Sequence, residues 1–444
     1  MKKVFLLFLA ALLIFTTACS GGGGGTAPAY GSGDYPTDDT YHPETDNPYF
    51  LYNIESYNRV ARSRDGYYFL LYGTLLYADA DTMQPIPVCA RPNCRHNEET
   101  DPVKKQECNA YFPVSVAGNV FVSNDQLYVF HKTFGLNINN EIKDMDDYAL
   151  TAITPDGTQR TTVFEVESDF ALMNMIHRGR FYIVTQSTNE QGFSTAELWS
   201  YSLDNPREEP KLLYQSEPLQ QTSNIVMNLY AYGTRLYLRE YLAVSDSGQE
   251  RVLRIYDLTT NEWTVLENPE GYSMGSQAIA DGQLIRAYSL PNASSAYNLG
   301  EELPDLSAPL TISQLDGSGE SEIDFATWGA MTADESYIYM RSPNYYEAQA
   351  DGTYVSSIST GSYYFYDPEM NLVDELHLED IAVKDTQLVS CTLYPTQGEH
   401  ILLYARYRRH MAFYYINRSE IGTGNITPVE FLNYTMDEYS FINN

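Results

Sequence analysis

The sequence predicts an all-β fold, a single β-propeller with seven four-stranded blades. A turn residue followed by an aromatic or aliphatic strand recurs along the chain, and each recurrence is followed by a second strand that ends on another turn. No unit shows the 3.6-residue periodicity of an amphipathic helix. Because a four-stranded sheet cannot bury both of its faces alone, such units are stable only when they stack around a common axis.

One position in the strand that follows each turn defines the repeat. The equivalent residues are Tyr68, Tyr128, Tyr182, Tyr237, Ile285, Tyr339 and Leu402. They lie 48 to 63 residues apart, so seven units account for about residues 50 to 435. A less regular strand precedes each turn, as in NVFVS, and a short strand closes the unit, as in KLLY. An array of two-sheet sandwiches is the competing fold, and the even spacing favours the ring.

The N-terminus has the layout of a secretory leader. Two lysines precede an apolar run over residues 4–15, which is too short to cross a bilayer comfortably, and small residues then lead to Cys19. We expect cleavage before Cys19 and lipidation of its side chain, although Thr16 stands where the lipidation motif usually has Leu. An ordinary secreted protein whose cleavage site contains Cys19 is the alternative.

The leader and the repeat together divide the chain into three parts. Residues 1–18 are predicted to be a lipoprotein-type signal peptide, residues 19–48 a Gly-rich flexible tether, and residues 49–444 the propeller domain. The Gly run after Cys19 and the Pro/Asp/Tyr-rich stretch behind it lack the apolar residues of a folded core. A lipid on a long tether places the domain at the bacterial cell membrane, facing outside.

The charge of the chain excludes one class of partner. Without residues 1–18 the chain has 25 basic and 59 acidic residues, a formal net charge of −34. Nucleic-acid binding needs basic patches that neutralise phosphates, so a nucleic-acid partner is not expected. Binding of anionic lipid head groups through the folded body is disfavoured for the same reason, which leaves the N-terminal lipid as the link to the membrane.

Residues 88–112 hold three of the five cysteines of the chain, together with a histidine. Cys89, Cys94, His96 and Cys108 match a tetrahedral structural zinc site in residue type, although the spacing C-x4-C-x-H-x11-C is that of no standard zinc finger. A disulfide between Cys108 and one of the other two cysteines explains the same loop equally well in an exported protein. Either bond makes the loop a structural connection between the first and second blades, on the face where propellers usually bind ligands.

Two resemblances follow from these motifs. The unit IYDLTTNEWTVLENPEG resembles a kelch repeat, with Tyr256, Asp257 and Trp263 at the kelch places. The whole chain resembles the β-propeller lipoproteins of Gram-positive anaerobes, through its leader, its Gly tether and the cysteine loop followed by ECNAYF. That resemblance implies a fold and a location, and it implies no reaction.

No catalytic residue is predicted, because the sequence contains no G-x-S-x-G, no HExxH and no Gly-rich phosphate loop. The leading hypothesis is therefore a non-catalytic, lipid-anchored module that binds a peptide, a glycan or another envelope protein outside the cell. The alternative is a glycan-active hydrolase or lyase whose carboxylates line the central funnel. Convergence of acidic side chains from several inner strands would favour the enzyme.

Overall fold

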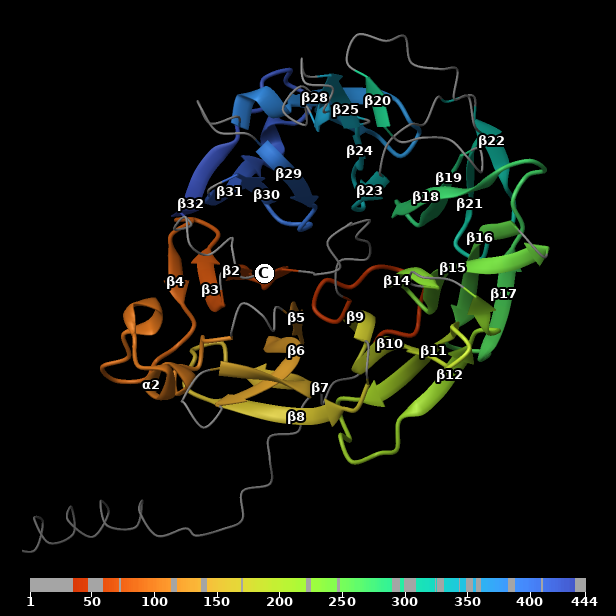
Figure 1. Cartoon of the computed structure of the whole chain (residues 1–444). Coiled ribbons are helices and arrows are strands. Elements are labelled where there is room, and N and C mark those ends of the chain that lie inside the picture. The colour runs from red at the N-terminus through yellow and green to blue at the C-terminus, as the bar shows by residue number, and fades with distance from the viewer. Residues whose placement is uncertain are drawn as a thin grey trace, which may run out of the picture.

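The chain forms a seven-bladed β-propeller, as the repeat predicts (Figure 1). The computed structural model describes residues 35–46, 59–71, 73–112, 118–136, 142–168, 171–220, 225–245, 248–289, 296–298, 309–323, 325, 331–342, 344–348, 354–356, 361–381, 388–408 and 410–435. The predicted signal peptide and the lipidation site at Cys19 lie outside these residues.

Each blade is a four-stranded antiparallel sheet whose strands follow one another along the chain. Blade 1 consists of β1 (Val60–Arg62), β2 (Gly66–Leu71), β3 (Thr74–Asp79) and β4 (Pro85–Pro87). Blade 2 consists of β5 (Asn119–Ser123), β6 (Gln126–Leu136), β7 (Ile142–Ile153) and β8 (Arg160–Val166). Blade 3 consists of β9 (Ala171–His177), β10 (Arg180–Thr188), β11 (Phe193–Ser202) and β12 (Lys211–Gln215). The short strand β13 (Leu219–Gln220) also pairs with β11.

Blades 4 to 7 continue the ring with the same order. Blade 4 consists of β14 (Val226–Tyr232), β15 (Arg235–Ser245), β16 (Gly248–Asp257) and β17 (Glu262–Leu266), and blade 5 of β18 (Ser273–Ala280), β19 (Gln283–Ser289), β21 (Leu310–Gln314) and β22 (Ser321–Ile323). Blade 6 consists of β23 (Met331–Ala333), β24 (Ile338–Arg341), β27 (Ser362–Tyr366) and β28 (Leu372–His377). Blade 7 consists of β29 (Leu388–Tyr394), β30 (His400–Tyr407), β31 (His410–Asn417) and β32 (Val429–Thr435).

Within the described residues, segments between blade strands add a small sheet and four short helices. The sheet is made of β20 (Ala296–Asn298), β25 (Asn344–Ala348) and β26 (Tyr354–Ser356), and the helices are η1 (His96–Glu98), α2 (Pro102–Gln106), η4 (Leu378–Ile381) and η5 (Arg418–Glu420). Among the described residues, none of the helices is both long enough and apolar enough to cross a membrane.

The position that defines the sequence repeat lies on the second strand of every blade. All seven of its residues are at most 5% exposed, because this strand has neighbours on both sides within its own sheet and a blade on each face. Alternate residues of the strand point to opposite faces of the sheet, so both must be apolar. This double burial explains why the tyrosines and aliphatic residues of the repeat could be recognised in the sequence.

Two-residue turns join the first and second strands of several blades. Asn124 and Asp125, Arg178 and Gly179, and Asp281 and Gly282 all have positive φ, as the primed turns of tight hairpins require. Because every first strand runs in the same sense, these turns lie together on one side of the ring, which we call the turn face. Arg178 is the unexpected member, since a long side chain rarely adopts positive φ without compensation elsewhere.

The ring closes between blades 7 and 1 without a shared strand in the described residues. Phe69 of blade 1 and Phe413 of blade 7 have ring centroids 5.2 Å apart, within a common apolar cluster. The Arg62 guanidinium donates to the Gln397 carbonyl at 2.6 Å, and the backbone N–H of His400 donates to the Tyr67 hydroxyl at 3.2 Å. Side-chain packing and a few cross-seam hydrogen bonds therefore hold the ring shut.

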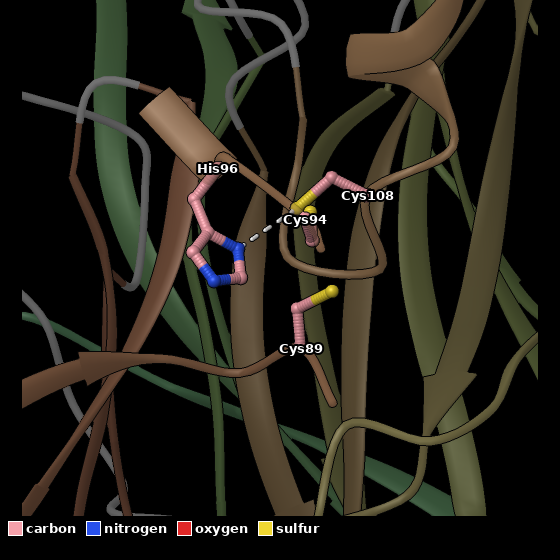
Figure 2. Close-up of side chains that lie close together, drawn as sticks. All are labelled: Cys89, Cys94, His96 and Cys108. Carbon is pink, nitrogen blue, oxygen red and sulfur yellow. Dashed lines mark hydrogen bonds between the residues drawn. The ribbon is translucent and has the colours of Figure 1, made fainter. Parts of the chain in front are cut away.

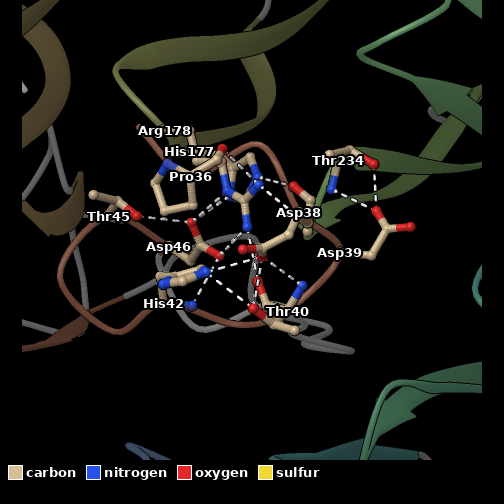
Figure 3. Close-up of polar contacts among 11 residues, drawn as sticks. Pro36, Asp38, Asp39, Thr40, His42, Thr45, Asp46, His177, Arg178 and Thr234 are labelled. Atoms are coloured by element: carbon tan, nitrogen blue, oxygen red, sulfur yellow. Dashed lines mark hydrogen bonds and ion pairs between the residues drawn. The ribbon is translucent and has the colours of Figure 1, made fainter. Parts of the chain in front are cut away.

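Residues 35–46, which we call the strap, lie against the turn face toward the middle of the ring (Figures 1 and 3). The buried guanidinium of Arg178 donates to both carboxylate oxygens of Asp46, at 2.9 and 3.1 Å. It also donates to the backbone carbonyls of Pro36, Asp38 and Thr40 at 2.8 to 2.9 Å. One arginine thus satisfies five acceptors of the strap, and these contacts compensate its positive φ.

A second set of contacts holds the strap to blade 4. Asp39 accepts hydrogen bonds from the backbone N–H and hydroxyl of Thr234 and forms an ion pair with Arg235. Tyr41 packs beside the buried cluster of blades 4 and 5, and burial raises the pKa of its hydroxyl. The strap falls within residues 19–48, the range that composition assigned to a flexible tether. Its ordered contacts are a difference from that expectation, and they arise from Arg178, Thr234 and Arg235, which are remote in sequence.

We expect Arg178→Ala to lower the free energy of unfolding by about 3–5 kcal/mol, because the carboxylate of Asp46 would remain buried without its cation. Urea denaturation of the variant and the parent chain measures this difference. Arg207→Ala is the matched control, since Arg207 is exposed in the loop between β11 and β12 and its loss should cost less than about 0.5 kcal/mol. Equal stability of the two variants would contradict the assigned role of Arg178.

Candidate metal centre

The cysteine loop, residues 88–112, connects β4 of blade 1 to β5 of blade 2, as predicted. In Figure 1 its helix α2 lies at the outer edge of the ring beside blades 1 and 2, away from the central opening. The loop is an edge connection packed against two blades, because its apolar end residues are buried in the cluster that both blades share.

Both ends of the loop are fixed by neighbouring blades. The backbone N–H of Phe112 donates to the carbonyl of Gly73 at 2.7 Å, which ties the end of the loop to blade 1. Arg160 at the start of β8 donates to the carbonyl of Tyr111 at 2.7 Å, and its guanidinium lies 4.1 Å from the centroid of the Phe112 ring. Cys108 and Phe112 are consequently almost completely buried.

The middle of the loop is held by local turns. The backbone N–H of Cys94 donates to the carbonyl of Arg91, and His96 adopts positive φ at the start of η1. The side chain of Asp101 accepts from the first backbone N–H groups of α2 and caps that helix. These turns bring residues separated by up to 19 positions to one point, with the strained backbone of His96 directly in the cluster.

The four predicted ligands converge (Figure 2). One donor atom from each of Cys89, Cys94, His96 and Cys108 lies within 4.8 Å of all the others. The Cys108 sulfur and the His96 Nδ1 atom are 3.5 Å apart. In a tetrahedral zinc site with Zn–S bonds of about 2.3 Å, sulfur atoms are roughly 3.8 Å apart. The cluster can therefore hold a metal ion with only small adjustments of its side chains.

The thiols of the cluster differ in acidity. Burial alone would raise the pKa of the Cys89 thiol, but hydrogen bonds from the backbone of Arg91 and Asn109 and from neighbouring thiols outweigh burial and lower it. Burial raises the pKa of the Cys108 thiol, and the adjacent Cys94 and Cys89 raise it further. A bound cation would stabilise all three thiolates together, since its charge reverses the repulsion among them.

The fifth cysteine plays no part in this loop. Cys391 lies on β29, the first strand of blade 7, and is buried in the apolar cluster of blades 6 and 7. Burial raises the pKa of its thiol to about 12, as expected of an inert core residue. None of the four described cysteines is joined in a disulfide. A Cys–Cys bond in the loop would leave a thiol and the imidazole of His96 in the cluster without a bonding role.

Two polar features of the ring escaped the sequence reasoning. Arg178 was overlooked because RGR reads as an ordinary turn, although an arginine replaces the Asn or Asp that other blades carry there. The second is an open cavity of about 410 Å³ between blades 2 and 3, whose lining residues include Asp147, Glu167 and Glu197. No local motif marks this cavity, because its lining comes from four separate segments.

No family model and no curated protein matches this chain. Among solved structures, the β-propeller domain of the Trilobed protease from Pyrococcus furiosus is 12% identical with a TM-score of 0.41, over 69% of this chain and 80% of that one. A prolyl endopeptidase is 9% identical with a TM-score of 0.49, over 88% of this chain and 49% of its own. An oligogalacturonate lyase in complex with manganese is 12% identical with a TM-score of 0.36, over 69% and 73%. At these values the likenesses carry no inference about activity.

The turn between β7 and β8 supports the cysteine loop through Gly157, and this contact is testable. Gly157 has a φ of +68°, and a Cβ atom there would lie 2.5 Å from the backbone nitrogen of Cys89. We expect Gly157→Ala to lower the free energy of unfolding by at least about 2 kcal/mol, from positive φ and overpacking together. Faster reaction of the loop thiols with a maleimide should accompany the loss.

Gly192→Ala is the matched control, because Gly192 has a φ of +83° and no atom lies within 4 Å of the position that a Cβ atom would take. We expect Gly192→Ala to lower the free energy of unfolding by about 1 kcal/mol, because only the strain of positive φ acts on the new alanine. The role of Gly157 in positioning the loop is refuted if both variants lose the same stability and keep the same thiol reactivity.

Proposed function

We propose that the protein is a lipid-anchored, extracytoplasmic propeller that binds a peptide, a glycan or an envelope protein without catalysing a reaction on it. The observation that carries the proposal is the separation of two features on the ring. The strap that continues from the predicted anchor docks on the turn face. The cavity between blades 2 and 3 is lined by residues at the far ends of β10 and β11, toward the opposite face. The strap and the cavity thus lie on opposite sides of the ring.

This arrangement suits a receptor at a membrane surface. Lipidation of Cys19 would leave fifteen residues between the lipid-bearing cysteine and the first described residue, Tyr35. Fifteen residues span at most about 55 Å, so Tyr35 would stay within about that distance of the bilayer. The opposite face would point away from the membrane, toward partners in the envelope. The acidic body would add no attraction to anionic head groups and would leave attachment to the lipid.

The charged groups on the turn face favour binding over carboxylate catalysis. The carboxylate of Asp334, next to the first strand of blade 6, is 2.7 Å from the Arg418 guanidinium and accepts from the Tyr339 hydroxyl at 2.6 Å. Asp46 is held by Arg178 in the same way. A glycosidase needs one carboxylic acid and one carboxylate aimed at a substrate, whereas these two carboxylates are each paired with an arginine, Arg418 and Arg178.

The cysteine loop supplies the structural part of the proposal. Three thiols and an imidazole at one point fit a closed tetrahedral zinc site, which leaves no position for a substrate. The ion would clasp about twenty residues that have little core of their own, and through Phe112 and Arg160 it would support the packing of blade 1 on blade 2.

Metal analysis tests the zinc proposal. The purified chain should contain one zinc ion per molecule, and Cys108→Ser should lose it, while Cys391→Ser should retain it. Removal of zinc by a chelator should lower the free energy of unfolding by about 2.7 kcal/mol relative to zinc held at a hundred times its Kd. A metal-free chain two daltons lighter than its reduced form would establish a disulfide instead.

Membrane attachment and ligand capture test the function as a whole. The full chain should fractionate with membranes and carry a lipid on Cys19 by mass spectrometry, whereas Cys19→Ala should be released. The detergent-solubilised mature chain should then bind members of a peptide library or a glycan array, and the bound peptides or glycans should be recovered chemically unchanged. Release of shortened peptides or sugars would identify an enzyme, and a soluble wild-type chain would contradict the anchor.

A further inference from the structure

The strap lies on the ring in the way that a separate bound peptide would (Figure 3). None of its residues belongs to a blade strand, and it contacts the turns of three consecutive blades. The residues of these turns that touch it, which we call the strap groove, are Asn124, Arg178, Gly179, Gly233, Thr234 and Arg235. The strap can therefore leave the groove without removing a strand from any blade.

Part of the groove is directed at the backbone of the strap. The backbone N–H of Asn124 donates to the carbonyl of Glu44 at 2.8 Å, and that of Arg178 donates to the carbonyl of Thr45 at 3.1 Å. The Arg178 guanidinium donates to three further carbonyls of the strap. Every peptide has such acceptors, so these bonds select an extended chain without selecting its sequence.

Two carboxylates, seven positions apart, supply the side-chain contacts. Asp39 pairs with Arg235, and Asp46 pairs with Arg178 through both of its oxygens. The strap has four acidic residues and neither lysine nor arginine. Charge-assisted hydrogen bonds of this kind are stronger than neutral ones, and complementary charge specifies the partner. In a strongly acidic chain, the groove is thus a local site for negative charge.

Two glycines allow the strap to approach the turns closely. A Cβ atom at Gly179 would overlap the aromatic ring of Tyr35, and one at Gly233 would lie 2.6 Å from the Cα atom of Asp39. Gly282 holds the place of Gly179 in the turn of blade 5, and the atom nearest to its Cβ position is the Tyr232 hydroxyl at 4.0 Å. The turns of blades 3 and 4 therefore have the shape of a bed for a peptide backbone.

The strap is held mainly by polar contacts, which water can replace. Tyr41 packs beside an apolar cluster of the ring, whereas Asp39 and Asp46 are held by hydrogen bonds and ion pairs. Segments with few buried apolar contacts open at a lower free energy than the sheets that carry them. Opening of the strap would leave Arg178 without Asp46 and Arg235 without Asp39.

We propose that the strap groove binds an acidic, extended segment of a partner protein, and that the strap is an internal competitor for this site. The partner segment presents two carboxylates about seven residues apart to Arg178 and Arg235, and its carbonyls replace those of Glu44 and Thr45. The inference goes beyond the proposed function, because it needs neither the lipid anchor nor the cavity between blades 2 and 3. The strap of a second copy has the same chemistry, and the test below separates the two.

Fluorescence anisotropy with a labelled peptide of residues 35–46 tests the proposal. The receptor is the mature chain with the double substitution Asp39→Asn and Asp46→Asn, which weakens the strap and leaves the groove intact. The peptide should bind this variant at least tenfold more tightly than the parent chain, because the internal competitor is weaker. A second peptide with the same two substitutions should bind the variant at least tenfold more weakly, and salt should weaken the first peptide.

Two glycine variants of the same receptor provide a matched pair. Gly233→Ala should abolish binding of the peptide, because the added methyl group fills the place of the Asp39 backbone. Gly282→Ala should leave binding unchanged, although its φ of +66° imposes a similar strain. No binding of the peptide at millimolar concentration, or equal binding of both peptides, would overturn the proposal.

Hydrogen exchange of the parent chain tests the release of the strap without any substitution. The amides of Asn124 and Arg178, whose acceptors lie on the strap, should open at least a hundredfold more often than the most protected amides of β6 and β10. Opening at the same frequency would show that the strap leaves only when the ring unfolds, which contradicts a displaceable competitor. Concentration-dependent dimers of the parent chain that Arg178→Ala abolishes would assign the groove to the strap of a second copy and overturn the partner proposal.

Discussion

The fold depends on one constraint: each blade has two apolar faces, and only a neighbouring blade can cover each of them. A blade at the end of an open row would expose a face as apolar as the one that holds Phe69 and Leu402. The ring removes both ends at once, and it does so here without a strand shared between blades 7 and 1 in the described residues. Closure therefore relies on side chains, such as the Phe69–Phe413 contact and the hydrogen bond from Arg62. Propellers that exchange a terminal strand have backbone pairing at this seam, whereas in the described part of this chain the contacts across it are made by side chains.

Two buried polar clusters interrupt the apolar packing, and each lies where an additional segment, the strap or the cysteine loop, contacts the ring. Arg178 is buried only because the strap returns over the turn face and supplies five acceptors. The cysteine loop adds a cluster of four donors at the outer edge, between blades 1 and 2. Both devices tie a segment with little core of its own to the rigid ring, and both use polar chemistry, since the apolar faces are already occupied by blades. Buried charges of this kind cost desolvation and are stable only when fully paired.

Sequence reasoning succeeded where a physical requirement acts on neighbouring residues. Double burial of the second strand fixes a tyrosine or aliphatic residue at one position of every repeat, so the number of units could be read directly from residues such as Tyr128 and Tyr237. Cys89, Cys94 and His96 lie close in sequence, and their convergence with Cys108 could be anticipated. Contacts between residues that are remote in sequence could not be anticipated. Nothing near Asp46 indicates Arg178, 132 positions away, and the cavity is formed by side chains of two blades whose register is fixed only by folding.

The central claim is that the seam between blades 7 and 1 is as firmly closed as the others, so that the ring unfolds as one unit. Native-state hydrogen exchange measures this directly by comparing the amides of β2 and β30 with those of β10 and β15. The account predicts that the most protected amides of all four strands exchange with the same opening free energy, equal to that of global unfolding. Exchange of β2 and β30 through an opening several kcal/mol less costly than that of β10 and β15 would contradict it.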